Sequence, residues 1–427
     1  MRYICDFHIH SKYSRATSRD MNIESLEKWA KIKGISVLGT GDFTHPLWLK
    51  ELKAKLEPAE EGLYKLSNQQ NNVRFILTSE ISCIYLKHGK VRKIHLIIFA
   101  PSFKVVERIN TQLSWSGNLS SDGRPILGMD VKEVLKIMLN SSPECLMVPA
   151  HVWTPWYSLF GSRSGFDSLR ECFEELSSYI FALETGLSSD PAMNWRLSAL
   201  DKYTLISNSD AHSPAKIGRE ANVFEGENLT YNSIIKAIKP KKDSSLDSKS
   251  KFGDRLSFVF TIEFFPEEGK YHYDGHRLCR VRLSPAERKK YGGICPNCGR
   301  PVTVGVLSRV DTLADREEGF TPTKARPFNK IVPLVEIIAE IFSQTTPTSK
   351  IVNEEYQRLI NYFGNEFEIL LNVPIEEIIK ISPKVGEGVK KIRRGEIKII
   401  PGYDGEYGKV QIFNREEEKK LNQKTLF

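Results

Sequence analysis

Histidines and carboxylates recur beside short apolar segments in the first half of this chain, and this pattern constrains the fold more than any other feature. The first such segment delivers Asp6, His8 and His10. Residues two apart in a strand point to the same side, so His8 and His10 can hold one metal ion between them. A single pair of this kind is weak support, and the interpretation depends on whether ligands recur beside the later segments.

The same half of the chain alternates apolar segments with helical patterns. The segments that predict strands are residues 3–7, 37–40, 75–80, 94–99, 145–149, 180–184 and 204–207. Helical periodicity between several of them, as in 22–33 and 131–139, indicates parallel β/α units. Repeated units of this kind in one domain predict a barrel, whose chemistry lies where the strands end.

Candidate ligands stand at or beside most of these predicted strands. They are Asp42, His45, Glu80, His95, His151, Asp210 and His212. Together with His8 and His10 they include six of the nine histidines, which random scatter rarely achieves. Imidazoles and carboxylates that converge on one barrel mouth are typical of a divalent metal site. A carboxylate that bridges two ions suits in-line attack on phosphorus.

These motifs resemble those of the PHP superfamily, which is named after polymerase and histidinol phosphatase. The resemblance covers the first half of the chain and implies an α/β fold, a distorted seven-stranded (β/α) barrel with a trinuclear metal site. By this resemblance the first ion has four ligands: His8, His10, Glu80 and Asp210. The second ion has three: Glu80 as the bridge, His95 and His151. His212 is assigned to the third.

The third site departs from the family pattern, because Phe43 stands where the motif has a histidine and Arg15 where a ligand is expected. Two interpretations are open. Either His45, with Asp42 nearby, completes the site, or the third ion binds weakly and Arg15 offers positive charge to a phosphate. We therefore expect two or three divalent ions, zinc, manganese or magnesium. The residues expected to act in catalysis are Asp210, Glu80 and Arg15.

Cysteines in the second half of the chain indicate a separate metal site. Cys295 and Cys298 enclose a Cys-Pro-Asn-Cys-Gly turn that is typical of a zinc knuckle, and Cys279 provides a third ligand. The fourth ligand is His276, with His272 as its rival. A closed site of this kind holds one structural zinc ion, which folds the segment and does not catalyse.

Several features outside the barrel suit nucleic acid, and the chain has a formal net charge of +8. Tyr273, Arg277 and Arg300 lie among the cations and aromatics around the knuckle, a combination that fits phosphate contact and base stacking. A solvated basic face is the alternative. Gly386 and Gly388 lie in a segment that resembles a helix-hairpin-helix, whose backbone amides grip a DNA phosphate. An ordinary helical turn is the alternative there.

The sequence divides into four regions. They are residues 1–238, a PHP catalytic barrel; 239–251, a linker; 252–328, a zinc-binding, DNA-contacting domain; and 329–427, a mainly helical C-terminal region. The last residues, 423–427, resemble the start of a sliding-clamp-binding peptide but lack its closing aromatic pair. A frayed tail is the alternative.

Over nearly its whole length the chain also resembles the endonuclease Q family, through the barrel, the knuckle and residues 269–277, 302–307 and 313–316. This resemblance implies a DNA repair endonuclease, acting on single- or double-stranded DNA. It would nick the phosphodiester bond 5′ of deaminated bases (uracil, hypoxanthine, xanthine) and of abasic sites by metal-activated water. Trp153 and Trp156 would then contact DNA or a flipped base, with core packing as the alternative. Arg196 would neutralise developing charge.

Two other functions compete with this prediction. One is a small-molecule PHP phosphatase, which would need no basic knuckle. The other is a DNA-binding scaffold with a partly decayed metal site, which the departures at Phe43 and Arg15 keep open. The chain has no apolar run long enough for a bilayer and begins with a predicted strand, not a signal peptide. We therefore expect a cytoplasmic monomer without a membrane partner.

Overall fold

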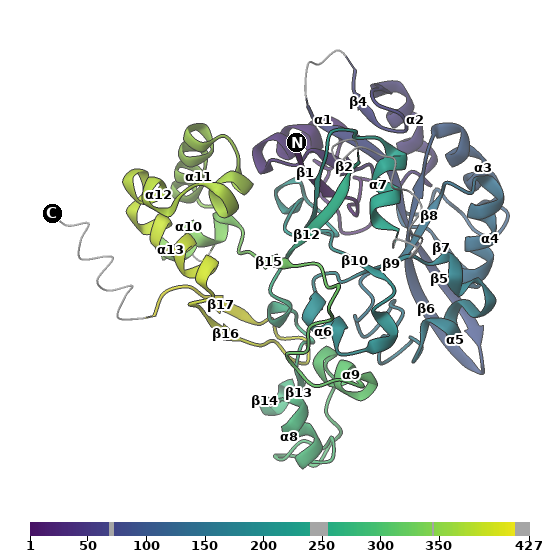
Figure 1. Ribbon diagram of the computed structural model, residues 1–427. Helices are drawn as coiled ribbons and strands as arrows, with labels where there is room; N and C mark the ends of the chain where they lie inside the picture. The colour runs from purple at the N-terminus through teal and green to yellow at the C-terminus, as the bar shows by residue number, and fades with distance from the viewer. Residues whose placement is uncertain (68–71, 240–254, 344–345, 415–427) are drawn as a thin grey trace.

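A sheet that closes on itself forms the centre of the structure. The computed structural model describes residues 1–67, 72–239, 255–343 and 346–414 (Figure 1). The strands of the barrel are β1 (Arg2–Asp6), β2 (Val37–Gly39), β5 (Arg74–Lys87), β6 (Lys90–Ala100), β8 (Leu146–Pro149), β9 (Ala182–Glu184) and β10 (Thr204–Ile206). β1, β2 and β5 pair in parallel, as do β9 and β10, while β6 is antiparallel to both β5 and β8.

Two local contacts complete the ring. The Val152 amide donates to the Glu184 carbonyl at 3.0 Å, which joins the chain just after β8 to the end of β9. Beyond β10, Ala211 forms a parallel bridge with Ile9, just past the end of β1. The fold is therefore an α/β barrel of distorted form, and this confirms the predicted fold class.

One pairing differs from the uniformly parallel units that the sequence predicted. β5 and β6 form an antiparallel hairpin that extends to the Lys87–Lys90 pair. Only His88 and Gly89 connect them, with φ of 51° and 71°, and so short a turn cannot make a parallel crossover. As a result, Glu80 and His95 lie on adjacent strands.

Helices cover the outside of the barrel. They are α1 (Ile23–Lys33), α2 (Pro46–Lys55), α3 (Phe103–Leu113), α4 (Val131–Ser141), α5 (Leu169–Phe173), α6 (Pro191–Trp195) and α7 (Tyr231–Ile238). α1 begins where the Asn22 side chain accepts from the Ser25 amide and ends at Gly34, whose φ is 88°. Among the described residues, no helix combines the length and the apolar character needed to cross a bilayer.

The sheet continues on the other side of β1. There β11 (Ala221–Glu225), β12 (Ser257–Glu263) and β15 (Phe328–Lys330) are added in that order. The predicted domain boundary at residue 252 is therefore misplaced, because β12 pairs with the barrel sheet. Long-range pairing of this kind leaves no local mark in the sequence. Most of the predicted linker, from residue 240 on, lies outside the described residues.

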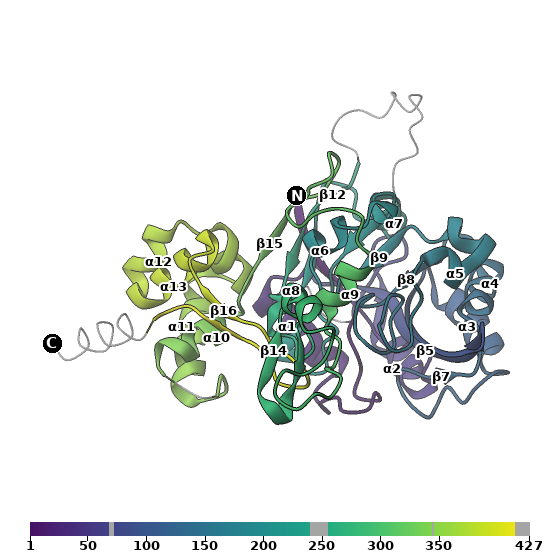
Figure 2. The same ribbon diagram turned by 90° about the horizontal axis from the view of Figure 1, so that it is seen from below.

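The knuckle segment lies between β12 and β15. Its elements are β13 (Asp274–His276), β14 (Val281–Leu283), α8 (Pro285–Lys290) and α9 (Val306–Leu313). The hairpin of β16 (Lys398–Ile400) and β17 (Lys409–Gln411) returns from the C-terminal region and runs beside β14 (Figure 2). Tyr403 of this hairpin forms a bridge with Tyr273. The predicted second and third domains are thus interleaved rather than consecutive.

Helices gather to one side of the barrel in the C-terminal region (Figure 1). They are α10 (Leu334–Ile341), α11 (Lys350–Phe363), α12 (Ile375–Ile381) and α13 (Pro383–Arg394). Gly386 and Gly388 lie buried inside α13, where a β-carbon would overlap Ile379 and press on Ile337, respectively. These glycines permit close helix packing, so the structure does not support their predicted grip on a DNA phosphate. The predicted clamp peptide, 423–427, lies outside the described residues.

A buried ion pair fastens this helical region to the barrel. Lys33 Nζ of α1 lies 2.7 Å from the Glu366 carboxylate, and each side chain is 4% exposed. Glu366 also accepts from the Tyr356 hydroxyl at 2.6 Å and from the Leu334 amide at 3.0 Å. One carboxylate thus joins α1, α10 and α11.

Removal of Glu366 should destabilise the protein strongly. In Glu366→Ala the Lys33 ammonium stays buried without a counter-charge, so we expect the free energy of unfolding to fall by about 3–5 kcal/mol in urea denaturation. The matched control is Glu107→Ala, which breaks the exposed Lys53–Glu107 pair and should cost less than about 1 kcal/mol. Equal losses in the two variants would contradict this account.

Candidate metal centre

Four side chains that the sequence groups together meet at the mouth of the barrel. They are His8, His10, Glu80 and Asp210, and their ligand atoms lie within 4.8 Å of one another. His10 Nε2 is 3.2 Å from Glu80 Oε2 and 3.1 Å from Asp210 Oδ1. His8, His10 and Glu80 are buried, whereas 26% of the Asp210 side chain is exposed. The group is therefore open to solvent on the Asp210 side.

A second group shares Glu80. His95 Nδ1 lies 2.7 Å and His151 Nε2 lies 3.1 Å from the other carboxylate oxygen, Glu80 Oε1. These two imidazole nitrogens are 3.2 Å apart. Glu80 thus presents Oε2 to the first group and Oε1 to the second, which is the arrangement of a carboxylate that bridges two ions.

Two buried carboxylates hold the histidines from behind. Glu184 lies 3.1 Å from His8 Nδ1, and Asp42 lies 3.1 Å from His10 Nδ1, which leaves each Nε2 directed at the ligand group. Such carboxylates fix the tautomer of a ligating imidazole and raise its basicity. Asp42, predicted as a possible ligand, instead supports His10 and accepts from the Ser11 hydroxyl at 2.7 Å. Glu184 was not among the predicted site residues, although its place at a strand end was a usable signal.

The buried polar atoms fit divalent cations. Among the described residues, His8 Nε2 has no hydrogen-bond partner, and it faces Glu80 Oε2 at 3.5 Å and Asp210 Oδ1 at 3.7 Å. Burial opposes ionisation of Asp210, but His8 and His10 outweigh it and hold the pKa of that carboxyl well below its usual range. A mixture of imidazole and carboxylate donors suits zinc or manganese.

Backbone strain coincides with these residues. Asp42, His151 and Asp210 have φ of 50°, 30° and 46°, in the left-handed region that residues other than glycine rarely adopt. Gly186 passes so close to His151 that a β-carbon there would overlap it. Strain of this kind concentrates at functional sites, where the surrounding structure maintains it.

Among the described residues, those predicted for a third ion form no ligand group of their own. Phe43 is fully buried in the core. His45 stacks on Tyr13, and its Nε2 lies 3.2 Å from the Ser120 carbonyl oxygen. The ring of His212 lies 4.5 Å from that of His10, and its Nδ1 is directed to the Asp210 carbonyl oxygen at 2.9 Å. In the part of the chain that the structure describes, neither His45 nor His212 joins a group able to hold a metal ion, so their predicted ligand roles are not supported.

The arginine that lies at the ligand groups is not the one that the sequence predicted. Arg15 extends into solvent, with 80% of its side chain exposed, and pairs with Asp122, so the structure does not place it at the ligand groups. Arg124, which sequence reasoning missed, donates from Nη1 to Glu80 Oε2 at 3.0 Å. Burial lowers the pKa of both His95 and His212, and the Arg124 charge adds to each shift. The guanidinium of Arg124 therefore faces the metal centre.

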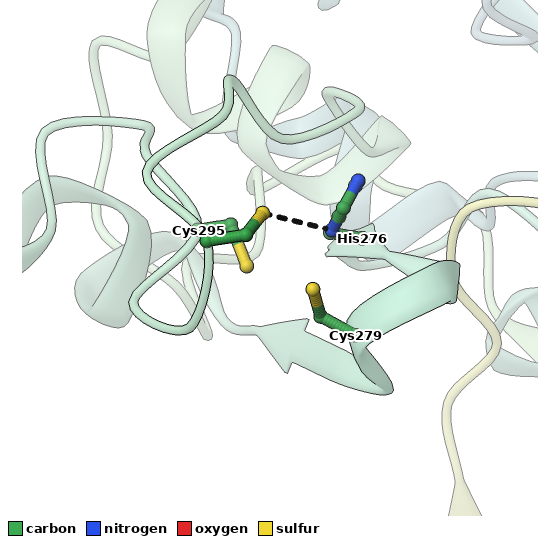
Figure 3. A group of neighbouring side chains, drawn as sticks. His276, Cys279 and Cys295 are labelled. Atoms are coloured by element: carbon green, nitrogen blue, oxygen red, sulfur yellow. Dashed lines mark hydrogen bonds between the residues drawn. The ribbon is translucent and has the colours of Figure 1, made fainter.

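The predicted ligands of the knuckle also come together. They are His276, Cys279, Cys295 and Cys298, with ligand atoms within 4.8 Å of one another. Figure 3 shows the ring of His276 and the sulfur atoms around a common centre. Backbone amides outweigh burial and lower the pKa of Cys295 to about 7, which favours the thiolate that binds zinc. The rival ligand, His272, is buried and stacks on Tyr273 instead.

The residues predicted to contact DNA divide into exposed and packed ones. Trp153 is fully buried and donates to Asn194 Oδ1 at 2.8 Å, so it packs in the core and its predicted DNA contact is not supported. Trp156, three residues later, is 38% exposed and contacts the ring of Tyr271. The two tryptophans therefore differ in burial, which cannot be read from the sequence, and only Trp156 is accessible to DNA.

The arginines predicted to contact DNA also divide into packed and exposed side chains. Arg196 pairs with Asp311 at 2.8 Å, with 11% of its side chain exposed, and so ties α6 to α9. The structure therefore does not support its predicted part in neutralising charge. Arg277 and Arg300 are exposed on the knuckle segment, and Tyr273 beside them is half-buried.

An α/β barrel with two such groups at its mouth is the architecture of a metal-dependent hydrolase. Residues 333–396 match the family model of the MJ0043 C-terminal domain. The chain is 35% identical over 267 residues to the uncharacterized protein MJ0043 of Methanocaldococcus jannaschii, an alignment that spans 61% of this chain and 31% of that protein.

Two solved structures match along almost the entire chain. The lesion-specific endonuclease PfuEndoQ from Pyrococcus furiosus is 31% identical, with a TM-score of 0.83 over 96% of this chain and 95% of that one. Endonuclease Q in complex with a 27-mer duplex substrate, which has an abasic lesion at the active site, is also 31% identical, with a TM-score of 0.83 over 98% of each chain. This chain belongs to the endonuclease Q family.

The supporting carboxylates should control metal affinity. We expect Glu184→Gln to weaken metal binding by about 10–100-fold, because His8 loses the charge that orients its ring. Competition with a chelator, together with metal analysis, measures this affinity. His45→Ala should bind metal as the wild type does, since its ring faces Tyr13 and Ser120. A loss in His45→Ala as large as that in Glu184→Gln would restore His45 as a ligand.

Proposed function

We propose that this chain is a DNA repair endonuclease that nicks the phosphodiester bond 5′ of deaminated bases (uracil, hypoxanthine and xanthine) and of abasic sites. The observation that carries this proposal is the Glu80 carboxylate, which faces a group of histidines with each of its oxygens. Divalent ions held there would lower the pKa of water and neutralise charge on the phosphate. The abasic duplex bound by one endonuclease Q structure supports DNA as the substrate.

The chain contributes a prearranged set of donors and acceptors to this reaction. Hydrolysis joins a water oxygen to phosphorus and releases the 3′ oxygen as a hydroxyl. Asp210 stands on the open side of the first group, where a phosphate enters. The Thr154 hydroxyl lies 3.2 Å from His151 Nδ1 and fixes that ring, with Nε2 toward Glu80. Donors fixed in advance need no rearrangement as charge develops.

A stripe of aromatic and cationic side chains offers a path for DNA beside the centre. The rings of Trp156 and Tyr271 are 5.4 Å apart, and Arg163 lies 6.0 Å from the Trp156 ring. Lys270 Nζ is 5.7 Å from the rings of both Tyr271 and Tyr407, and Tyr407 is 76% exposed. Aromatic faces stack on bases while the cations contact phosphates, without reading sequence.

The knuckle would add further contacts. Its four ligands would hold one structural zinc ion, and Arg277 and Arg300, which are exposed on the same segment, would contact the DNA backbone. Zinc, manganese or magnesium would serve in the barrel. We retain two further hypotheses: a sliding-clamp contact through residues 423–427, and a monomeric protein.

Incision of labelled duplexes tests the function. The wild type should nick duplexes that contain uracil, hypoxanthine or an abasic site, should leave the unmodified duplex intact, and should stop when a chelator is added. Asp210→Ala should abolish nicking and largely retain DNA binding, because it removes a ligand and no contact of the aromatic stripe. Hydrolysis of a chromogenic phosphomonoester without incision would favour a small-molecule phosphatase. A purified protein that carries only the knuckle zinc would favour a scaffold.

The aromatic stripe has its own test. Trp156→Ala should weaken binding of lesion DNA by about 5–150-fold, since stacking on one base contributes about 1–3 kcal/mol. Fluorescence anisotropy with an abasic duplex measures this. Tyr362→Ala is the matched control, because that ring is 64% exposed on α11 in the helical region. Unchanged affinity in Trp156→Ala would remove the stripe from the DNA path.

A further inference from the structure

Arg124 brings a fixed positive charge to the shared carboxylate. Its Nη1 lies 3.0 Å from Glu80 Oε2, and 28% of its side chain is exposed beside the fully buried Glu80. A guanidinium has five N–H donors in a rigid fork. Across the residues that the structure describes, Nη1 alone of these donors has a hydrogen-bond partner, so the others remain for a ligand that enters from the open side.

The loop that carries Arg124 is held on both sides. Before it, Gly123 packs so closely that a β-carbon there would overlap the Asp42 carboxylate, which supports His10. After it, the Pro125 carbonyl accepts from the Ser82 amide of β5 at 3.0 Å. The loop that carries Arg124 is thus held against Asp42 and against β5, the strand that carries Glu80.

The charge of this arrangement differs from that of a trinuclear site. Of the residues predicted for a third ion, His45 faces the Ser120 carbonyl, and His212 lies beside His10 with Nδ1 directed to the Asp210 carbonyl oxygen. A guanidinium adds one positive charge where a divalent ion adds two. A phosphodiester carries one negative charge, whereas a phosphomonoester approaches two at neutral pH. The planar fork also matches two oxygens of one phosphate. A single fixed cation therefore suits a diester.

We propose that Arg124 takes the place of a third metal ion in this centre and donates to a non-bridging oxygen of the scissile phosphate. The barrel then holds two ions, in the two groups that share Glu80. The role of Arg124 toward DNA rests on the proposed function, whereas the number of ions does not. A donor at this point stabilises the charge that develops as water attacks phosphorus.

The test uses the full-length protein and three variants: Arg124→Ala, Arg124→Lys and, as a control of equal charge change, Arg170→Ala. Arg170 is exposed on α5. Metal analysis should give three ions per chain in all four proteins, two in the barrel and one in the knuckle. Arg124→Ala should lower the single-turnover rate on an abasic duplex by about 10²–10³-fold, with little change in DNA affinity. Arg124→Lys should recover part of that rate, because it retains the charge without the fork.

Several results would overturn the inference. They are four ions per chain in the wild type, loss of a barrel ion or of thermal stability in both Arg124 variants, and incision by Arg124→Ala at the wild-type rate. If the wild type cuts no DNA, the proposed function fails and a small substrate decides: bis(p-nitrophenyl) phosphate. Slower hydrolysis of this diester by Arg124→Ala, but not by Arg170→Ala, supports the role of Arg124. Equal hydrolysis by the two variants, or none by the wild type, overturns it.

Discussion

The rest of the site depends on the contacts of the Glu80 carboxylate with the histidines on either side of it. One oxygen lies 3.2 Å from His10 Nε2 and the other 2.7 Å from His95 Nδ1, so a single side chain sets the spacing between two groups of imidazoles. The hairpin of β5 and β6 fixes this arrangement, because it places Glu80 and His95 on adjacent strands. A parallel crossover at that point would have separated them.

Charge explains why the site must hold cations. The barrel mouth gathers four carboxylates around its histidines: Glu80, Asp210, Asp42 and Glu184. Removing such groups from water costs several kcal/mol each unless positive charge compensates. Burial alone would raise the pKa of Glu80, yet His95, Arg124 and His8 hold it well below its usual range. Divalent ions would neutralise the carboxylate charge that these residues offset only in part.

The sequence predicted the barrel and the residues that meet at its mouth, because strand ends and ligand types are local features. It did not predict what depends on contacts between distant segments. Arg124 lies in a loop with no ligand-like spacing, and its role derives from a bond to Glu80. Burial sends Trp153 to the core and leaves Trp156 exposed, although both belong to one aromatic loop. β12 belongs to the barrel sheet through its pairing with β11, which no local pattern shows.

Anomalous diffraction at the zinc absorption edge, from crystals grown with zinc, tests the bridging role of Glu80 most directly. We expect a pair of peaks at the barrel mouth, one beside each oxygen of the Glu80 carboxylate. The Arg124 guanidinium should contact the same carboxylate. A single peak at the mouth, or a pair of peaks that Glu80 does not join, would contradict this bridging role.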